Sequence, residues 1–212
     1  MTDLSASLLE KLKELRIHAR QDPDRVAVAE DAIRGLEASS RLQLPEDYRT
    51  FLTAIGRAFF TDVVIRDVGT YPYDNFPIEL FFGADPATRN SISEMRDVFR
   101  LQLPDTVIAI GADAGFDCAC IECGEENYGA VYLMDKRYRT TTRQRIIEMT
   151  ESLRSSQVDT SRLNSWQIIQ EWELRNPAEI THRPGYGNLH QVATSFSEFV
   201  MKLEYHPFDD DE

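Results

Sequence analysis

Three cysteines lie in the segment "GFDCACIEC", residues 115–123, and the chain has no others. Thiolates bind zinc and attack electrophiles, so cysteines this close together could form a metal site or a redox centre. A structural zinc site takes four converging ligands, however, and on an extended strand Cys118 and Cys120 point to one face while Cys123 points to the other. Free cysteine is also among the most buried residue types. We therefore expect the cysteines to fill the core and the protein to need no cofactor, with a metal or a redox thiol as the alternatives.

Residues 101–135 contain seven acidic side chains and no lysine or arginine, in a chain whose net charge is −13. Such a surface repels nucleic acid and membrane phosphates and attracts basic proteins, although the charge can also serve solubility alone. We expect carboxylates at strand ends and turns to face outward on a rigid sheet, where they could contact a basic protein partner. These candidates are Asp113, Asp117, Glu122, Glu125, Glu126 and Asp135.

Two alternatives compete with this interpretation of the acidic block. Asp113 and Asp117 could instead accept backbone hydrogen bonds within a turn, a common role of aspartate. The run "KRYRTTTRQR", residues 136–145, carries five basic groups and could fold back to neutralise the acidic block within the molecule.

A second candidate for partner binding is the segment "GTYPYDNFP", residues 69–77. Its Tyr71, Tyr73 and Asp74 combine rigid aromatic area with charge, as the centres of protein interfaces often do. The four histidines, by contrast, are scattered, and no hydrolase, metalloprotease or phosphate-binding motif occurs. We therefore expect a binding protein rather than an enzyme.

Hydrophobic periodicity predicts the order of helices and strands. Leucines at positions 4, 8, 12 and 15 favour a helix near 3–20, a second helix is expected near 26–39, and a third begins at Leu44-Pro45. Sheet-forming residues follow from Ala58, and helical spacing returns near 92–99. The runs "TVIAIG", "FDCACIEC" and "AVYLMD" favour an antiparallel meander, with "GEENYG" as a hairpin loop.

The C-terminal third is expected to contain a helical insertion at about 136–190, with helices near 143–154 and 162–175. A closing helix in "ATSFSEFVMKL" has Ser195 and Glu198 at capping-box spacing. The predicted fold is therefore α+β: one domain, residues 1–208, with a mixed or antiparallel sheet of about five or six strands flanked by helices. Residues 209–212 are an acidic tail. No signal peptide or membrane span is recognisable, so a cytoplasmic location is expected.

Three pieces of the chain, in this order, resemble the SUKH superfamily of Smi/Knr-type domains: "LEASSRLQLPEDYRTFLTAIG", then "VIAIGADAGFDCACIEC" with "GAVYLMD", then "VATSFSEFVMKL". In that family a helix pair with a Leu-Pro-x-x-Tyr junction precedes a mixed sheet, a Gly-Asp-containing strand turn and a closing Ser-Phe-x-x-Phe helix. Here Phe116 replaces the glycine before the strand aspartate, and the stretch from Lys136 to Gln191 is longer than the family needs.

The resemblance implies a single α+β domain without catalytic residues. For most bacterial members it implies an immunity protein that binds and silences a polymorphic toxin, often a nuclease. Fungal relatives instead act as adaptors that regulate cell-wall synthesis, which is the alternative function. Sequence alone does not identify the toxin or the oligomeric state.

Overall fold

The computed structural model describes residues 6–17, 23–69, 71, 73–100, 103–115, 117–134, 138–163, 168, 171, 172, 175 and 189–207. The helices are α1 (Ala6–Glu14), α2 (Pro23–Ser40), α3 (Glu46–Ala54), α4 (Ile92–Phe99), α5 (Tyr138–Ser155) and α7 (Phe196–Met201). The strands are β1 (Ala58–Phe59), β2 (Val63–Ile65), β3 (Phe76–Pro77), β4 (Leu80–Phe81), β5 (Val107–Ala112), β6 (Cys118–Glu122), β7 (Val131–Met134), β8 (Leu189–Ala193) and β9 (Leu203–Tyr205).

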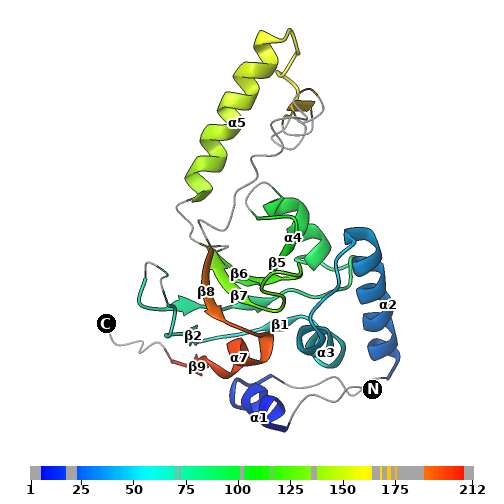
Figure 1. Cartoon of the computed structure of the whole chain (residues 1–212), viewed down its shortest axis with the longest axis vertical. Helices are drawn as coiled ribbons and strands as arrows, with labels where there is room; N and C mark the ends of the chain where they lie inside the picture. The colour runs from blue at the N-terminus through cyan, green and yellow to red at the C-terminus, as the bar shows by residue number, and fades with distance from the viewer. Residues whose placement is uncertain are drawn as a thin grey trace.

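The strands form two antiparallel sheets. The larger sheet has the order β1-β4-β5-β6-β7-β8, and the smaller one has the order β3-β2-β9. Helix α4 lies over one face of the larger sheet, while α3 and α7 lie on the other (Figure 1). The α+β fold predicted from the sequence, including the β5-β6-β7 meander, is confirmed.

Each covering helix has an apolar face that the sequence periodicity identifies. In α3 the buried residues are Tyr48, Phe51 and Leu52, and in α4 they are Ile92, Met95 and Phe99. Because helices cover both faces of the sheet, the central strands have no solvent side, and every residue of β5, β6 and β7 is buried. This explains why their sequences are continuous apolar runs rather than alternating ones.

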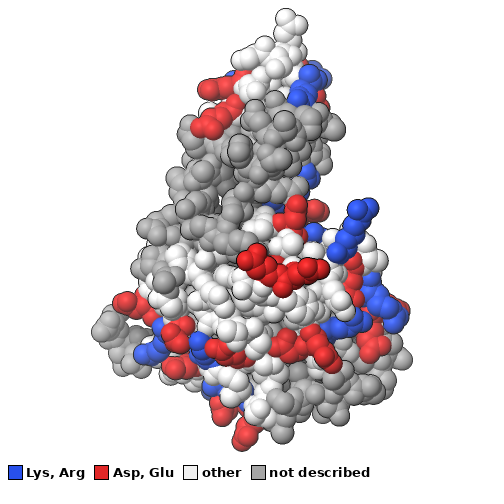
Figure 2. Space-filling view, in the orientation of Figure 1, with Lys and Arg blue, Asp and Glu red and all other residues white. Residues whose placement is uncertain are grey.

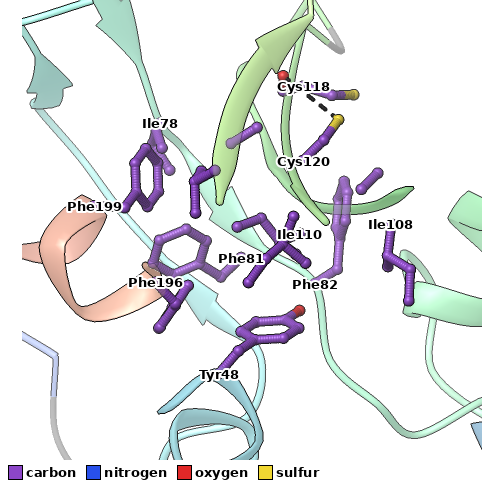
Figure 3. Close-up of a cluster of buried hydrophobic side chains, with 14 of the residues drawn as sticks. Tyr48, Ile78, Phe81, Phe82, Ile108, Ile110, Cys118, Cys120, Phe196 and Phe199 are labelled. Carbon is purple, nitrogen blue, oxygen red and sulfur yellow. Dashed lines mark hydrogen bonds between the residues drawn. The ribbon is translucent and has the colours of Figure 1, made fainter. Parts of the chain in front are cut away.

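A core of aromatic rings joins α3 and α7 to the sheet (Figure 3). The ring centroid of Phe196 lies 4.8 Å from that of Tyr48 and 5.7 Å from that of Phe81. Next to this cluster β5 has an irregular register between Ala109 and Gly111. A Cβ added at Gly111 would lie 2.8 Å from both the Leu80 carbonyl oxygen and the Phe81 ring, so only glycine fits there.

The structure corrects three of the predicted element boundaries. The insertion was expected to extend to residue 190, but Leu189 and His190 already belong to β8, which pairs with β7. The closing helix ends at Met201 rather than at Leu203, because Leu203 begins β9 and pairs with Ile65. Pro45 is the N-cap residue of α3, so this helix begins at Glu46 rather than at Leu44-Pro45.

Helix α5 projects away from the body of the protein (Figure 1). It has a small apolar cluster of its own, separate from the main core, in which Met149 and Leu153 pack with Ile168 and Trp172. The predicted helix near 143–154 therefore exists, and it begins earlier than expected. The helix expected near 162–175 and the 209–212 tail lie mostly or wholly outside the described residues.

None of the helices in the described part of the chain is long and apolar enough to cross a bilayer.

Candidate functional site

The three cysteines are buried in the larger sheet, as expected for core residues. The Cys120 thiol lies 3.9 Å from the Cys118 carbonyl oxygen (Figure 3). Burial raises the pKa of the Cys120 thiol, and it raises the pKa of Cys123 to about 12, with a further contribution from the Glu122 carboxylate. Both thiols are therefore protonated near neutral pH and are poor nucleophiles. Among the described residues no group of three or more His, Cys, Asp or Glu side chains is placed to hold a metal ion.

The two carboxylates that flank strand β6 do not face outward. Asp117 is 2% exposed and Glu122 is fully buried, so the expectation that both reach the surface is wrong. The physical reason is that β6 is a central strand between β5 and β7, and all of its residues are buried. Neither carboxylate can contact a partner directly in this fold.

These ends of β6 instead use their polar groups to hold turns. An Asp113 carboxylate oxygen accepts a hydrogen bond from the Asp117 amide at 2.7 Å, so the alternative that Asp113 stabilises a turn is confirmed. At the other end, a Glu122 carboxylate oxygen accepts a hydrogen bond from the Gly124 amide at 2.6 Å. The half-buried Asp113 keeps part of its surface exposed, so it remains a candidate for partner binding.

The β6–β7 turn, residues 124–130, carries the acidic side chains that do reach solvent. Glu125 and Glu126 are both exposed, and next to them Tyr128 is 46% exposed. The backbone closes the turn with hydrogen bonds from the Gly129 amide to the Glu122 carbonyl and from the Ala130 amide to the Asn127 carbonyl, each at 2.9 Å. The turn is therefore fixed by its own backbone as well as by the Glu122 carboxylate.

Tyr128 ties this turn to a distant part of the chain. Its hydroxyl donates a hydrogen bond to the carbonyl of Leu44, in the loop between α2 and α3, at 2.9 Å. Partial burial raises the pKa of Tyr128, as do the charges of Glu37 and Asp47 nearby. The Tyr128 hydroxyl is therefore hydrogen-bonded, while the apolar part of the ring is half exposed near acidic groups.

The surroundings of the turn are acidic and only partly neutralised. The Glu37 carboxylate pairs with the Arg49 guanidinium at 2.8 Å. Among the described residues, no ion pair involves Glu46, Glu125 or Glu126. Figure 2 shows a compact group of acidic side chains on a mostly uncharged part of the surface, level with β6 and β7 in Figure 1.

The predicted aromatic patch at 69–77 divides into a buried and an exposed part. Tyr71 is only 6% exposed, and its ring packs against Phe76 and His190 at centroid distances of 5.6 and 5.7 Å. The prediction that Tyr71 contacts a partner directly is therefore wrong, because its ring is buried between Phe76 of β3 and His190 of β8. Tyr73, 44% exposed, and Asp74 remain on the surface.

Asp135 and the side chains of residues 136–145 lie outside the described part of the structure. Sequence reasoning missed Tyr128, although it lies in the "GEENYG" loop that was identified as a hairpin. An aromatic residue beside two acidic ones in such a loop was the available signal.

The comparisons with known proteins agree with this fold. The family model described as SMI1 / KNR4 family (SUKH-1) matches residues 27–153. That segment begins within α2, ends within the last turn of α5, and contains the meander, the β6–β7 turn and the Leu44-Pro45 junction. No curated protein and no solved structure matches the chain significantly. The match covers more than half of the chain, and the chain belongs to the SMI1 / KNR4 (SUKH-1) family.

Proposed function

We propose that this protein is an immunity protein, which binds a basic toxin in a stoichiometric complex and thereby blocks it. The observation that supports the proposal most is the β6–β7 turn, where Glu125 and Glu126 are exposed on a backbone fixed from both sides. SUKH-1 domains are associated with protein partners, and binding of this kind needs no reacting groups.

The turn has the properties that fast and tight protein binding requires. Acidic groups on a chain of net charge −13 accelerate the encounter with a basic protein, which matters for an inhibitor that must act before the toxin does. A fixed turn loses little conformational entropy when a partner binds. Tyr128 adds a large half-exposed ring with few rotatable bonds, a residue type common at interface hot spots.

The remaining surface candidates extend the proposed contact area. Asp113 lies at the turn before β6, at the opposite end of that strand from Glu125 and Glu126. Tyr73 and Asp74 form a separate exposed patch on the segment between β2 and β3. We propose the β6–β7 turn as the centre of the interface and these residues as secondary contacts.

The direct test is co-expression with any toxin domain that a neighbouring gene encodes, with cell survival as the measurement. The wild-type chain is expected to restore growth. The double variant Glu125→Arg with Glu126→Arg is expected to bind the toxin at least tenfold more weakly, roughly the effect of reversing two close interfacial charges, and to lose protection.

A matched control changes the same number of charges elsewhere. Glu10 and Glu30 are exposed on α1 and α2, so the double variant Glu10→Arg with Glu30→Arg should protect as well as the wild type. Full protection by the turn variant would refute the proposed surface. Survival no better than with an empty vector for the wild-type chain would refute toxin inhibition and favour a regulatory adaptor role.

A further inference from the structure

A cleft of about 420 Å³ lies between α2 and α4. Its size is within the range of pockets that hold small organic molecules. Side chains from α2, from α4 and from the segment leading into β5 line it: Leu36, Ser39, Ser93, Arg96, Asp97, Arg100, Leu103, Pro104, Asp105 and Val107.

Helix α4 is amphipathic: its apolar face packs on the sheet and its polar face lines the cleft. Ile92, Met95 and Phe99 are buried against the sheet. The cleft-lining residues Ser93, Arg96, Asp97 and Arg100 recur at spacings of three, four and seven, so they form one stripe beside that apolar face.

The floor of the cleft is apolar. Leu36 and Val107 are 3% exposed and Leu103 is 4% exposed, so each presents only a small part of its surface to the cleft. The Ser39 hydroxyl donates to the Leu36 carbonyl at 3.0 Å, which leaves the Ser39 oxygen as an acceptor at the edge. A ligand in the cleft can therefore contact apolar side chains as well as the polar groups of α4.

Arg96 determines the charge that the ligand should carry. Its side chain is partly buried, and no ion pair among the described residues involves it. The Cys123 thiol lies close enough to feel its positive charge. A partly desolvated guanidinium presents donors in a fork that suits a carboxylate or a phosphate. The exposed Asp97 and Asp105 also line the cleft and would repel an anion from their part of it, which favours an anion placed on Arg96.

We propose that the α2–α4 cleft binds a small organic anion, with its carboxylate or phosphate on Arg96 and its apolar body on Leu36, Leu103 and Val107. The cleft borders the base of the proposed toxin-binding turn, because the Cys123 amide donates to the Thr106 carbonyl and Val107 pairs with Glu122. The proposal does not depend on what the turn binds.

The test is a titration of the full-length, isotopically labelled protein, followed by NMR chemical shifts. The probes are phenylacetate, its uncharged counterpart phenylacetamide, phenyl phosphate and inorganic phosphate. We expect phenylacetate or phenyl phosphate to shift resonances of α2 and α4 saturably. Phenylacetamide should bind about tenfold more weakly, because it lacks the charge-assisted hydrogen bond.

Two kinds of variant locate the site. Arg96→Gln should weaken binding about tenfold, whereas Arg96→Lys should retain most of it. Ser93→Leu should block the cleft without changing any charge. Arg89→Gln, at an exposed arginine outside the cleft, is the matched control and should bind like the wild type. Thermal unfolding of each variant checks that it is folded.

Three kinds of outcome would overturn the proposal. One is that no anionic probe shifts these resonances at millimolar concentration. Another is that phenylacetamide binds as tightly as phenylacetate, or that Arg96→Gln binds as tightly as Arg89→Gln. The third is equal binding of inorganic phosphate and phenyl phosphate, which would mean that the apolar floor takes no part.

Discussion

Strand β6 and the turn that follows it carry the same acidic residue type and use it in opposite ways. Glu122 is fully buried at the end of the strand, whereas Glu125, three residues later, is exposed on the turn. The first accepts a backbone hydrogen bond that holds the turn, and the second is available to a partner. The role of each carboxylate therefore depends on whether it is buried. The buried Glu122 helps to hold the turn on which Glu125 and Glu126 are exposed.

Replacing each glutamate separately with alanine tests whether Glu122 and Glu125 have different roles. Glu122→Ala should lower the free energy of unfolding by about 2 kcal/mol or more, because it leaves a cavity and removes the acceptor of the Gly124 amide. Glu125→Ala should change it by less than about 0.5 kcal/mol, as is usual for exposed positions. Urea unfolding measures both, and equal effects of the two variants would contradict the assigned roles.

A glycine substitution tests how closely the sheet interior is packed. Gly111→Ala should destabilise the protein by about 1–3 kcal/mol, because the new methyl group would meet the Leu80 carbonyl and the Phe81 ring at 2.8 Å. Gly35→Ala is the matched control. Gly35 lies within α2, and no atom lies within 4 Å of its added Cβ, so this change should stabilise the helix by about 0.5–1 kcal/mol. The same sign for both changes in thermal unfolding would argue against the close packing.

Two tyrosines allow the same test of buried and exposed positions with the removal of a single hydroxyl group. The Tyr48 hydroxyl is buried and has no hydrogen-bond partner among the described residues, while the Tyr128 hydroxyl bonds the Leu44 carbonyl. Tyr48→Phe should therefore leave stability unchanged or raise it by up to about 1 kcal/mol, because an unsatisfied polar group is removed. Tyr128→Phe should cost about 0.5–1.5 kcal/mol. A larger loss for Tyr48→Phe in chemical denaturation would show that its hydroxyl has a partner.

A further prediction concerns the cysteine thiols and pH. The pKa of Cys123 is raised from its ordinary value of 9.0 to about 12, and that of Cys120 is raised too, so the folded state holds these protons more tightly than the unfolded state. Their contribution to stability is complete below pH 9 and is lost as the pH rises from 9 towards 12. Denaturation midpoints at a series of alkaline pH values measure this decline. At pH 8 a thiol reagent should label the cysteines only after unfolding, and rapid labelling of the native protein would contradict their burial.

Local patterns in the sequence were enough to predict most elements of the fold. The spacing of Tyr48, Phe51 and Leu52 identified the buried face of α3, and the continuous apolar runs identified the meander. The predicted Ser195 cap is present, since the Ser195 hydroxyl accepts from the Glu198 amide at 3.1 Å, while the Glu198 carboxylate accepts from the Thr194 amide rather than from that of Ser195. Such features were predictable because each depends on neighbours within one or two helical turns.

Two strands were missed because their sequences also suit other structures. "LHQVA", now β8, lies between a segment expected to be an insertion and a helix, and its strand character comes from pairing with β7. β9 is three residues long and continues directly from α7, so its sequence was read as the end of that helix. In both cases the partner strand is distant along the chain, and no local pattern contains that information.

The amino-acid sequence was sufficient to identify the apolar faces of α3 and α4 and the strongly acidic character of the chain. The sequence did not show which carboxylates reach solvent, because their exposure depends on the elements that pack around them in the tertiary structure. The tertiary structure also joined Tyr128 to Leu44 across 84 positions of sequence and brought α2 beside α4 to form a cleft. These contacts are long-range, and packing of the whole core, rather than any local propensity, sets them.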